Sequence, residues 1–248
     1  MARPNAPVMQ FGLTAANQCG YLPTEQERIA VLLEPPAAQR SAEDYERLLQ
    51  AGFRRSHNDL YRPWCDHCSA CQSLRVDSHN FTPSRSQRRV SNKNRDLALV
   101  IQQYPQLPAS HAELFCRFIN ERHADGSMYP PNPDKFATWV ACSWHPPEFW
   151  EWYLEDELVM VAIVDRLSES LSAMYTFFNP RLAERSLGTF AILEQLRVAQ
   201  EASLHWVYLG YQIDDCHKMN YKAKFMPHQR YISQQWVPSA IEANRLQP

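Results

Sequence analysis

The apolar residues of this chain follow two different patterns, and the first half is the less regular. Ser41 and Asp44 form a start signal of the capping-box type, with Asp in place of the usual Glu or Gln, and they predict a helix that ends at Gly52. Residues 53–81 show little helical period and surround a group of cysteines. We therefore expect one early helix followed by an irregular segment.

Similar start signals predict three more helices, over residues 84–97, 110–126 and 133–139. Ser84 or Ser86 caps the first of these, which is rich in basic residues. Ser110 and Glu113 open the second, which is amphipathic. Pro133 suits the first turn of the third.

Short β-rich runs begin near residue 149. The three runs are Phe149–Leu154, Leu158–Val164 and Leu171–Phe178. The short polar segments between them are typical of hairpin turns, so we expect three antiparallel strands. The pattern then predicts a helix at Thr189–Glu201, a strand at His205–Gly210, a helix at Cys216–Lys224 and a strand at Arg230–Val237. This order predicts an α+β domain from about residue 105 to the end.

The composition excludes several classes of protein. Hydrophobic residues make up 45% of the 248 positions and charged residues 21%, as expected for a chain with a packed core. No run approaches the roughly 18 apolar residues of a membrane span, and residues 1–17 lack a signal-peptide core. We therefore expect a cytoplasmic protein that is not held in a membrane. The six glycines are isolated, which weighs against NAD enzymes and P-loop NTPases.

The net charge of −2 hides an uneven distribution. Residues 54–95 carry nine basic and three acidic side chains, whereas the segments on both sides are acidic overall. This distribution indicates a binding surface for a polyanion, although a solvated helix face remains the alternative.

Three of the seven cysteines lie at two-residue intervals, at Cys65, Cys68 and Cys71, and Cys19 is a plausible fourth partner. Such spacing lets consecutive turns direct sulfur atoms at one centre, which suits zinc or an iron–sulfur cluster. A redox-active thiol pair is the alternative, but no thioredoxin-like βαβ pattern surrounds the motif.

Several segments together resemble the aminoacyl-tRNA–protein transferases. In the first half they are Cys19-Gly-Tyr-Leu-Pro23, Gly52-Phe-Arg-Arg-Ser56, the segment from Tyr61 to Cys71, and Phe81 to Arg89. In the second half they are Arg122-His123, Tyr175-Thr-Phe-Phe178, Ser186-Leu-Gly-Thr189, Tyr208-Leu-Gly-Tyr211 and Lys218-Met-Asn-Tyr-Lys222. The resemblance runs from about residue 10 to residue 237 and is strongest to the bacterial members that transfer leucine.

The resemblance implies a function and a fold. Leucine would pass from leucyl-tRNA to proteins with an N-terminal Asp or Glu and mark them for degradation, with no organic cofactor and no DNA partner. The fold would be an N-terminal Cys-cluster and basic domain over residues 1–104, followed over 105–248 by a catalytic domain similar to the GNAT acyltransferases, with a mixed sheet. The stretch Arg185–Phe190 has a single glycine, so a coenzyme A pyrophosphate would fit poorly there.

The reaction would be aminolysis of an ester, which needs positioning and an oxyanion stabiliser rather than a covalent intermediate. As catalytic residues we consider Tyr221, Lys218 and Asp214, with His123 and Asp215 as further proton acceptors. For the donor we consider Tyr175, Phe177, Tyr208 and Tyr211, beside the loop of Ser186 and Gly188, although core packing is an equal alternative for Phe177. For the acceptor carboxylate we consider Arg122, Arg166, Arg185, Lys218 and Lys222. The group Arg85, Arg88 and Arg89 would serve the tRNA or the acceptor.

Lys218 and Lys222 are four residues apart, so a helix would place both on one face, near Tyr221.

Three other functions remain open from the sequence. Arginyl transfer would need an acidic donor pocket in place of an apolar one. A zinc-stabilised RNA-binding module without catalysis would bind tRNA whether or not it is charged. A coenzyme A-dependent acetyltransferase is the last.

Overall fold

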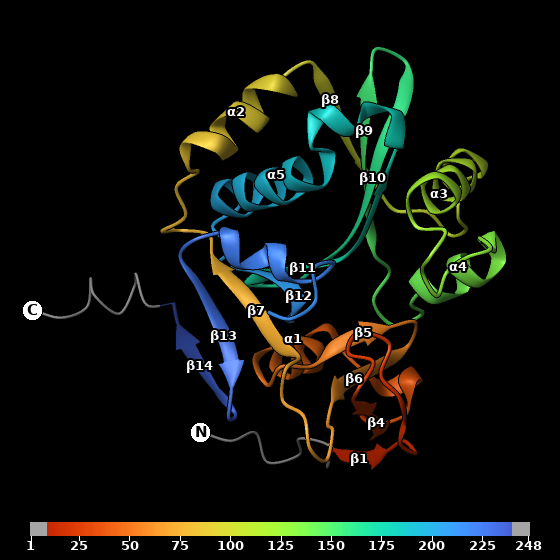
Figure 1. Cartoon of the computed structure of the whole chain (residues 1–248), viewed down its shortest axis with the longest axis vertical. Helices are drawn as coiled ribbons and strands as arrows, with labels where there is room; N and C mark the ends of the chain where they lie inside the picture. The colour runs from red at the N-terminus through yellow and green to blue at the C-terminus, as the bar shows by residue number, and fades with distance from the viewer. Residues whose placement is uncertain (1–8, 240–248) are drawn as a thin grey trace, which may run out of the picture.

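The computed structural model describes residues 9–239, which are organised around two β-sheets (Figure 1). The smaller sheet lies at the bottom of Figure 1 and has the strand order β1-β4-β6-β5. Its strands are β1 (Gln10–Leu13), β4 (Ile29–Glu34), β5 (Arg54–Ser56) and β6 (Asp59–Pro63). Beside it lie a short ladder of β2 (Asn17–Gln18) and β3 (Gln26–Glu27), the 3₁₀ turn η1 (Ala37–Gln39) and the helix α1 (Ala42–Gln50). Tyr45 and Leu49 of α1 are fully buried in an apolar core shared with both sheets.

The larger sheet has eight strands in the order β14-β13-β7-β12-β11-β10-β9-β8. In chain order, its first strands are β7 (Gln72–Asp77), β8 (Leu97–Gln102) and β9 (Glu148–Leu154). The others are β10 (Glu157–Arg166), β11 (Ser170–Phe178), β12 (Trp206–Gln212), β13 (His228–Ile232) and β14 (Gln235–Pro238). Every neighbouring pair is antiparallel except β11 and β12, so the sheet is mixed.

Helices cover both faces of the larger sheet. In Figure 1, α2 (Arg85–Lys93) and α5 (Leu187–Glu201) lie on one side of β9–β11, and α3 (Ala109–Arg122) and α4 (Pro133–Val140) lie on the other. Two 3₁₀ turns, η2 (Pro180–Arg185) and η3 (Asn220–Lys224), follow β11 and β12. The main core lies between these layers and includes Trp150, Trp152 and Phe177, each fully buried. Among the described residues, no helix has the length and apolar character needed to cross a membrane.

Most of the predicted elements are present. The three-strand meander is confirmed as β9, β10 and β11, and the helix after Ser41 is confirmed with the Ser41 hydroxyl accepting from the Asp44 amide. The helix predicted from Ser110 begins at Ala109 and has Pro108 at its N-cap, without a side-chain cap. The last predicted strand is a hairpin of β13 and β14.

The predicted helix over Cys216–Lys224 is wrong. Only residues 220–224 are helical, as the 3₁₀ turn η3. The Lys222 amine donates to the Tyr211 carbonyl at 2.7 Å, and the Ala223 amide donates to the Gln212 side chain. These bonds hold the segment against β12, and Lys218 therefore does not share a helical face with Lys222.

The predicted boundary between the two domains falls between residues 104 and 105. β7 and β8 precede this division, yet β7 pairs with β12 and β13, and β8 pairs with β9. The larger sheet is therefore built from both sides of the division. The division into domains of residues 1–104 and 105–248 stays a prediction.

Replacing Ser84 with alanine is expected to lower the free energy of unfolding by about 1 kcal/mol. Ser84 and Gln87 form a complete capping box at the start of α2, and the variant leaves the Gln87 backbone amide without its partner, the Ser84 hydroxyl. Ser86→Ala is the matched control because Ser86 is exposed in the first turn and its hydroxyl bonds the Ser84 hydroxyl, not a backbone donor of the helix. Urea unfolding measures both variants, and equal losses of stability would contradict the prediction.

Candidate functional site

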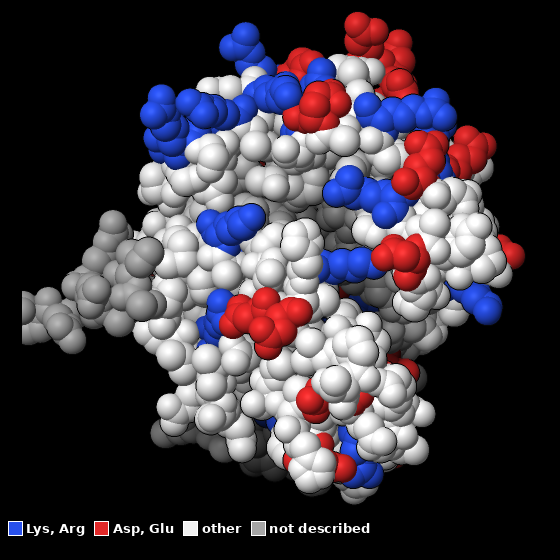
Figure 2. Space-filling model, in the orientation of Figure 1, with Lys and Arg blue, Asp and Glu red and all other residues white. Residues whose placement is uncertain are grey.

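The two parallel strands of the larger sheet separate soon after they meet. β11 and β12 pair only over Ser170–Ser172 and Trp206–Tyr208. Beyond Ser172, β11 stays paired with β10 and β12 stays paired with β7, so the edges that face each other lose their partner strand. Separation of this kind exposes backbone donors and acceptors inside a sheet, where a ligand can use them. Figure 2 shows a hollow on this face of the molecule, with Lys and Arg side chains on its rim.

Both strands are irregular where they separate. The pairing of β11 with β10 skips Met174, and the pairing of β12 with β7 skips Leu209, which places a β-bulge on each strand. Gly210 follows the second bulge with a φ of 85°, a conformation that favours glycine. β-Bulges are frequent beside active sites because they redirect backbone groups.

Arg54 from the small sheet fills the bottom of this separation. Its guanidinium donates to the Ala173 carbonyl of β11 and, at 3.4 Å, to the Tyr208 carbonyl of β12. A Cβ atom on Gly210 would lie 3.7–3.8 Å from the guanidinium, so the glycine brings the backbone of β12 close to this side chain. Arg54 therefore joins the two strands where the sheet hydrogen bonds stop.

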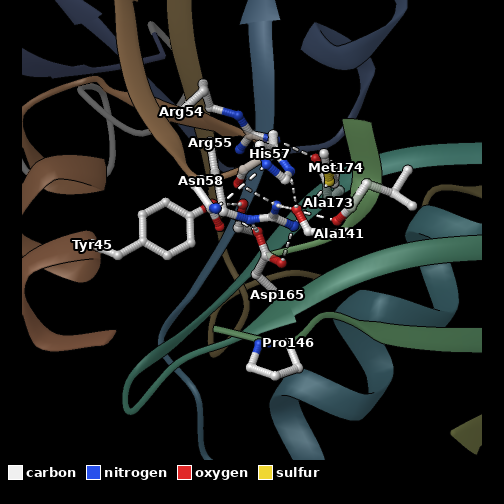
Figure 3. Close-up of polar contacts among 12 residues, drawn as sticks. Tyr45, Arg54, Arg55, His57, Asn58, Ala141, Pro146, Asp165, Ala173 and Met174 are labelled. Carbon is white, nitrogen blue, oxygen red and sulfur yellow. Dashed lines mark hydrogen bonds and ion pairs between the residues drawn. The ribbon is translucent and has the colours of Figure 1, made fainter. Parts of the chain in front are cut away.

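The neighbouring Arg55 points to the opposite side and forms a buried ion pair (Figure 3). Its guanidinium donates to both oxygens of Asp165, at 2.7 and 3.0 Å, and Tyr45 donates to the same carboxylate at 2.9 Å. Both charged side chains are fully buried. Since Arg55 belongs to β5 and Asp165 to β10, the pair connects the two sheets next to the candidate site.

Basic side chains lie at the end of α3 and at the turn before η3. The Lys218 amine pairs with Asp125 at 2.7 Å, which links the turn before η3 to the loop after α3. The Arg122 guanidinium lies over the Phe178 ring, with 5.4 Å to its centroid. Burial, followed by the charges of Arg122 and Lys218, lowers the pKa of His123. His123 is therefore neutral at pH 7 and is able to accept a proton.

The predicted donor residues fall into two groups. Tyr175 is half-buried on the free part of β11 and contacts Trp139 and Phe136 at ring-centroid distances of 5.3 and 5.7 Å. Phe177 is fully buried, which favours core packing. Tyr208 and Tyr211 are also buried, with their hydroxyls bonded inside the protein, to Arg75 and to the Gly52 and Tyr61 carbonyls. The partly exposed aromatic side chains are therefore Tyr175 on β11 and Trp139 on α4, which pack over the buried Phe136.

Several of the other predicted residues are already paired inside the protein. Asp214 accepts from Arg230 at 2.7 Å, which lowers its pKa and makes it a weak proton acceptor. Tyr221 is exposed in η3, next to the buried Lys222. Ser186 caps α5 with a left-handed φ of 54°, and a Cβ atom on Gly188 would make only an ordinary contact with Phe178. Arg166 pairs with Glu148 and Arg185 with Asp96.

Lys222 is expected to make stability depend on pH. Burial, and then the charge of Arg54, lowers the pKa of Lys222 from 10.5 to about 8. Between these two values the unfolded chain binds more protons, so raising the pH favours the folded state. Wild-type protein should gain on the order of 3 kcal/mol over this range relative to Lys222→Met. Urea unfolding of both proteins at about pH 7.5 and about pH 10 measures the gain, and a constant difference between them contradicts it.

The basic segment forms an exposed surface on α2. Arg85, Arg88 and Arg89 are all exposed, and Gln87 is the buried residue of the helix. Figure 2 shows Lys and Arg gathered over this helix, at the upper left. The basic segment is thus an exposed helix, and its polyanion partner stays a prediction.

The four motif cysteines line one cavity. Cys19, Cys65, Cys68 and Cys71 border a space of about 370 Å³ that also includes Tyr61 and Tyr211. Burial and the neighbouring thiols raise the pKa of Cys71 to about 12, so the free thiol is protonated at pH 7. Within residues 9–239, no group of three Cys, His, Asp or Glu side chains has the arrangement of a metal site. The four sulfurs have the right chemistry for zinc or iron but would have to move closer together.

Comparison with known families shows what kind of protein carries this site. Residues 17–89 match the family model "Arginine-tRNA-protein transferase, N terminus", and residues 110–232 match "Arginine-tRNA-protein transferase, C terminus". The chain thus belongs to the class of aminoacyl-tRNA–protein transferases.

Individual relatives narrow the assignment. An aspartate/glutamate leucyltransferase of Aeromonas hydrophila is 49% identical over 92% of this chain and 94% of its own length. The protein of the same name from Pseudoalteromonas atlantica is 46% identical over 92% and 96%. The chain belongs to this family of leucyltransferases. A solved C-terminal domain of a putative lysylphosphatidylglycerol synthetase from Agrobacterium fabrum is 14% identical over 80% of this chain and 64% of its own, with a TM-score of 0.49.

Proposed function

We propose that the chain transfers leucine from leucyl-tRNA to the α-amino group of proteins that begin with Asp or Glu. The observation that supports this most strongly is the similarity, over nearly the whole chain, to relatives named aspartate/glutamate leucyltransferase. The comparisons favour neither arginyl transfer nor a binding module without catalysis. The leucine would mark its target for degradation, and the cytoplasm is the compartment that we propose.

The separation of β11 and β12 is the proposed site of reaction. The acceptor amine attacks the ester carbonyl carbon, a C–N bond forms, and the C–O bond to the ribose breaks. The amine loses a proton, and the ribose oxygen gains one as it leaves. The unpaired backbone edge of β11, from Met174 onward, supplies N–H groups for the oxyanion. Neutral His123 is the proposed proton acceptor, since the pKa of Asp214 is lowered by its ion pair.

A partly exposed aromatic pair supports leucine over arginine. Tyr175 and Trp139 contact each other beside the separated strands, over the buried Phe136. A leucyl side chain gains from burial against such rings, whereas an arginyl side chain needs an acidic partner. The proposal is tested by offering leucyl-tRNA and arginyl-tRNA in parallel to a peptide that begins with Asp. Faster incorporation of arginine would overturn the proposed donor.

We also propose a GNAT-like fold for the catalytic part. The support is the order of elements: an antiparallel meander β9–β11, the helix α5, and the parallel strand β12 that separates from β11. Arg54 occupies the bottom of the separation, and the start of α5 lacks a cluster of glycines. Both features disfavour coenzyme A as a ligand.

We further propose that Cys19, Cys65, Cys68 and Cys71 hold zinc or an iron–sulfur cluster. In this position the metal would fasten the segments around β2, β3 and β6 to each other, without a part in the chemistry. Serine at Cys65, Cys68 or Cys71 is expected to lower both metal content and melting temperature. Cys116→Ser is the control, since Cys116 lies on α3. Full metal content and an unchanged melting temperature in all three variants would contradict the proposal.

A further inference from the structure

Two cations next to the separated strands are buried without an acidic partner. The side chains belong to Arg54, which is 6% exposed, and Lys222, which is 5% exposed. No carboxylate of residues 9–239 lies within 4.0 Å of either charged group. By contrast, Arg55 is equally buried and is fully paired with Asp165. Burial of a charge is costly unless an opposite charge compensates it. Two buried cations without a carboxylate partner therefore indicate a missing anion.

The two cations border the same stretch of backbone. Arg54 reaches the Tyr208 carbonyl and lies beside Gly210, and Lys222 donates to the Tyr211 carbonyl at 2.7 Å. They are also close enough for the charge of Arg54 to lower the pKa of Lys222. Lys222 is still largely charged at pH 7, because its pKa is about 8. Both positive charges therefore lie against the β12 backbone between residues 208 and 211.

The bonds that Arg54 makes leave part of its fork available. The side chain has five N–H donors, and the two carbonyl oxygens of Ala173 and Tyr208 account for one on each terminal nitrogen. An Arg fork is well suited to a carboxylate, since two parallel N–H donors match its two oxygens. Backbone carbonyls orient the guanidinium without neutralising its charge.

We propose that Arg54, with Lys222 as a second cation, binds the side-chain carboxylate of the acceptor's N-terminal Asp or Glu. The proposal rests on the proposed function, because it assigns the acceptor of that reaction to this place. The acceptor amine must approach the ester beside the free edge of β11, and its own carboxylate lies only a few bonds away. This anion supplies the charge that the site lacks. The exposed arginines of α2 are then left for the tRNA backbone.

Binding of two peptides that differ only in this carboxylate tests the proposal. One peptide begins with Asp and its twin begins with Asn, and calorimetry gives the Kd of each. Wild-type protein is expected to bind the Asp peptide at least about tenfold more tightly. Arg54→Gln should remove most of this preference, Arg54→Lys should keep part of it, and Lys222→Met should reduce it. Arg197→Ala, an exposed side chain on α5, is the matched control and should leave the ratio unchanged.

The ratio of the two Kd values separates recognition from structure. If Arg54 has only a structural role, its replacement will weaken binding of both peptides equally, and that result would overturn the proposal. A wild-type protein that binds the two peptides equally well would also overturn it. If Arg54→Gln fails to fold, the ratio of the two Kd values is measured for Arg54→Lys and Lys222→Met, and a smaller preference for the Asp peptide is expected in both. Weaker binding of leucyl-tRNA with an unchanged peptide ratio would assign Arg54 to an RNA phosphate and contradict the proposal.

The closing experiment distinguishes this inference from the proposed function. Leucine transfer by wild-type protein together with an Asp preference that survives Arg54→Gln would overturn the inference alone. An Asp preference that depends on Arg54, in a protein that transfers no leucine, would overturn the proposed function and leave the carboxylate site in place.

Discussion

Replacing Arg55 with methionine is expected to lower the free energy of unfolding by about 3–5 kcal/mol. The variant leaves the Asp165 carboxylate buried with only the Tyr45 hydroxyl as a strong donor. It also removes the bonds of Arg55 to the carbonyls of His57 and Val140, which connect β5 to the end of α4. The loss is large because a buried charge without a partner costs more than the pair itself contributes.

Urea unfolding of three variants measures this effect. Arg55→Met alone should be the least stable, and the double variant Arg55→Met/Asp165→Leu should recover much of the loss, because it removes both charges. Arg197→Ala, which breaks an exposed ion pair with Glu201, is the control and should cost less than about 1 kcal/mol. A double variant that is less stable than Arg55→Met would contradict the explanation by an unpaired charge.

Replacing Arg85, Arg88 and Arg89 together with glutamine is expected to weaken binding of leucyl-tRNA about tenfold or more at moderate salt. All three side chains are exposed on α2, and each phosphate contact that is lost removes the release of roughly one counterion. The helix itself should persist, because its capping residues Ser84 and Gln87 are unchanged.

The salt dependence of binding gives the stricter test. The slope of log K against log salt should become shallower by about two to three units in the triple variant. An equal loss of affinity at every salt concentration, without a change of slope, would mean that these arginines do not contact phosphates. Transfer at saturating leucyl-tRNA should be close to the wild-type rate, because α2 packs on α5 and takes no part in the separated strands.

Local signals in the sequence predicted many of the elements but not their partners. The capping residues at Ser41 and Ser84 and the alternation in β9–β11 act within a few residues, so they are visible in one segment. No such local signal predicts where β7 lies, because its position between β12 and β13 depends on pairing with residues more than 120 positions away. The predicted helix at Cys216–Lys224 failed for the same reason, since buried Lys222 is held by Tyr211 and not by its own helix.

The candidate site was predictable in its residue types and less so in its geometry. The cysteines and the arginines of α2 were found from spacing and charge, because both are clustered in the sequence. Arg54 is not predictable as a site residue, since nothing in the local sequence distinguishes it from Arg55. The two side chains point to opposite sides of β5, so one meets a carboxylate and the other two carbonyls. Only the arrangement of the two sheets shows this difference.

The measurement that tests the central claim most directly is mass analysis of acceptor peptides after incubation with the protein and leucyl-tRNA. Four peptides with identical tails begin with Asp, Glu, Arg or Ala. The account predicts one added leucine at the N-terminus of the Asp and Glu peptides and none on the other two. Leucine on all four peptides, or on none of them with metal-replete protein, would contradict it.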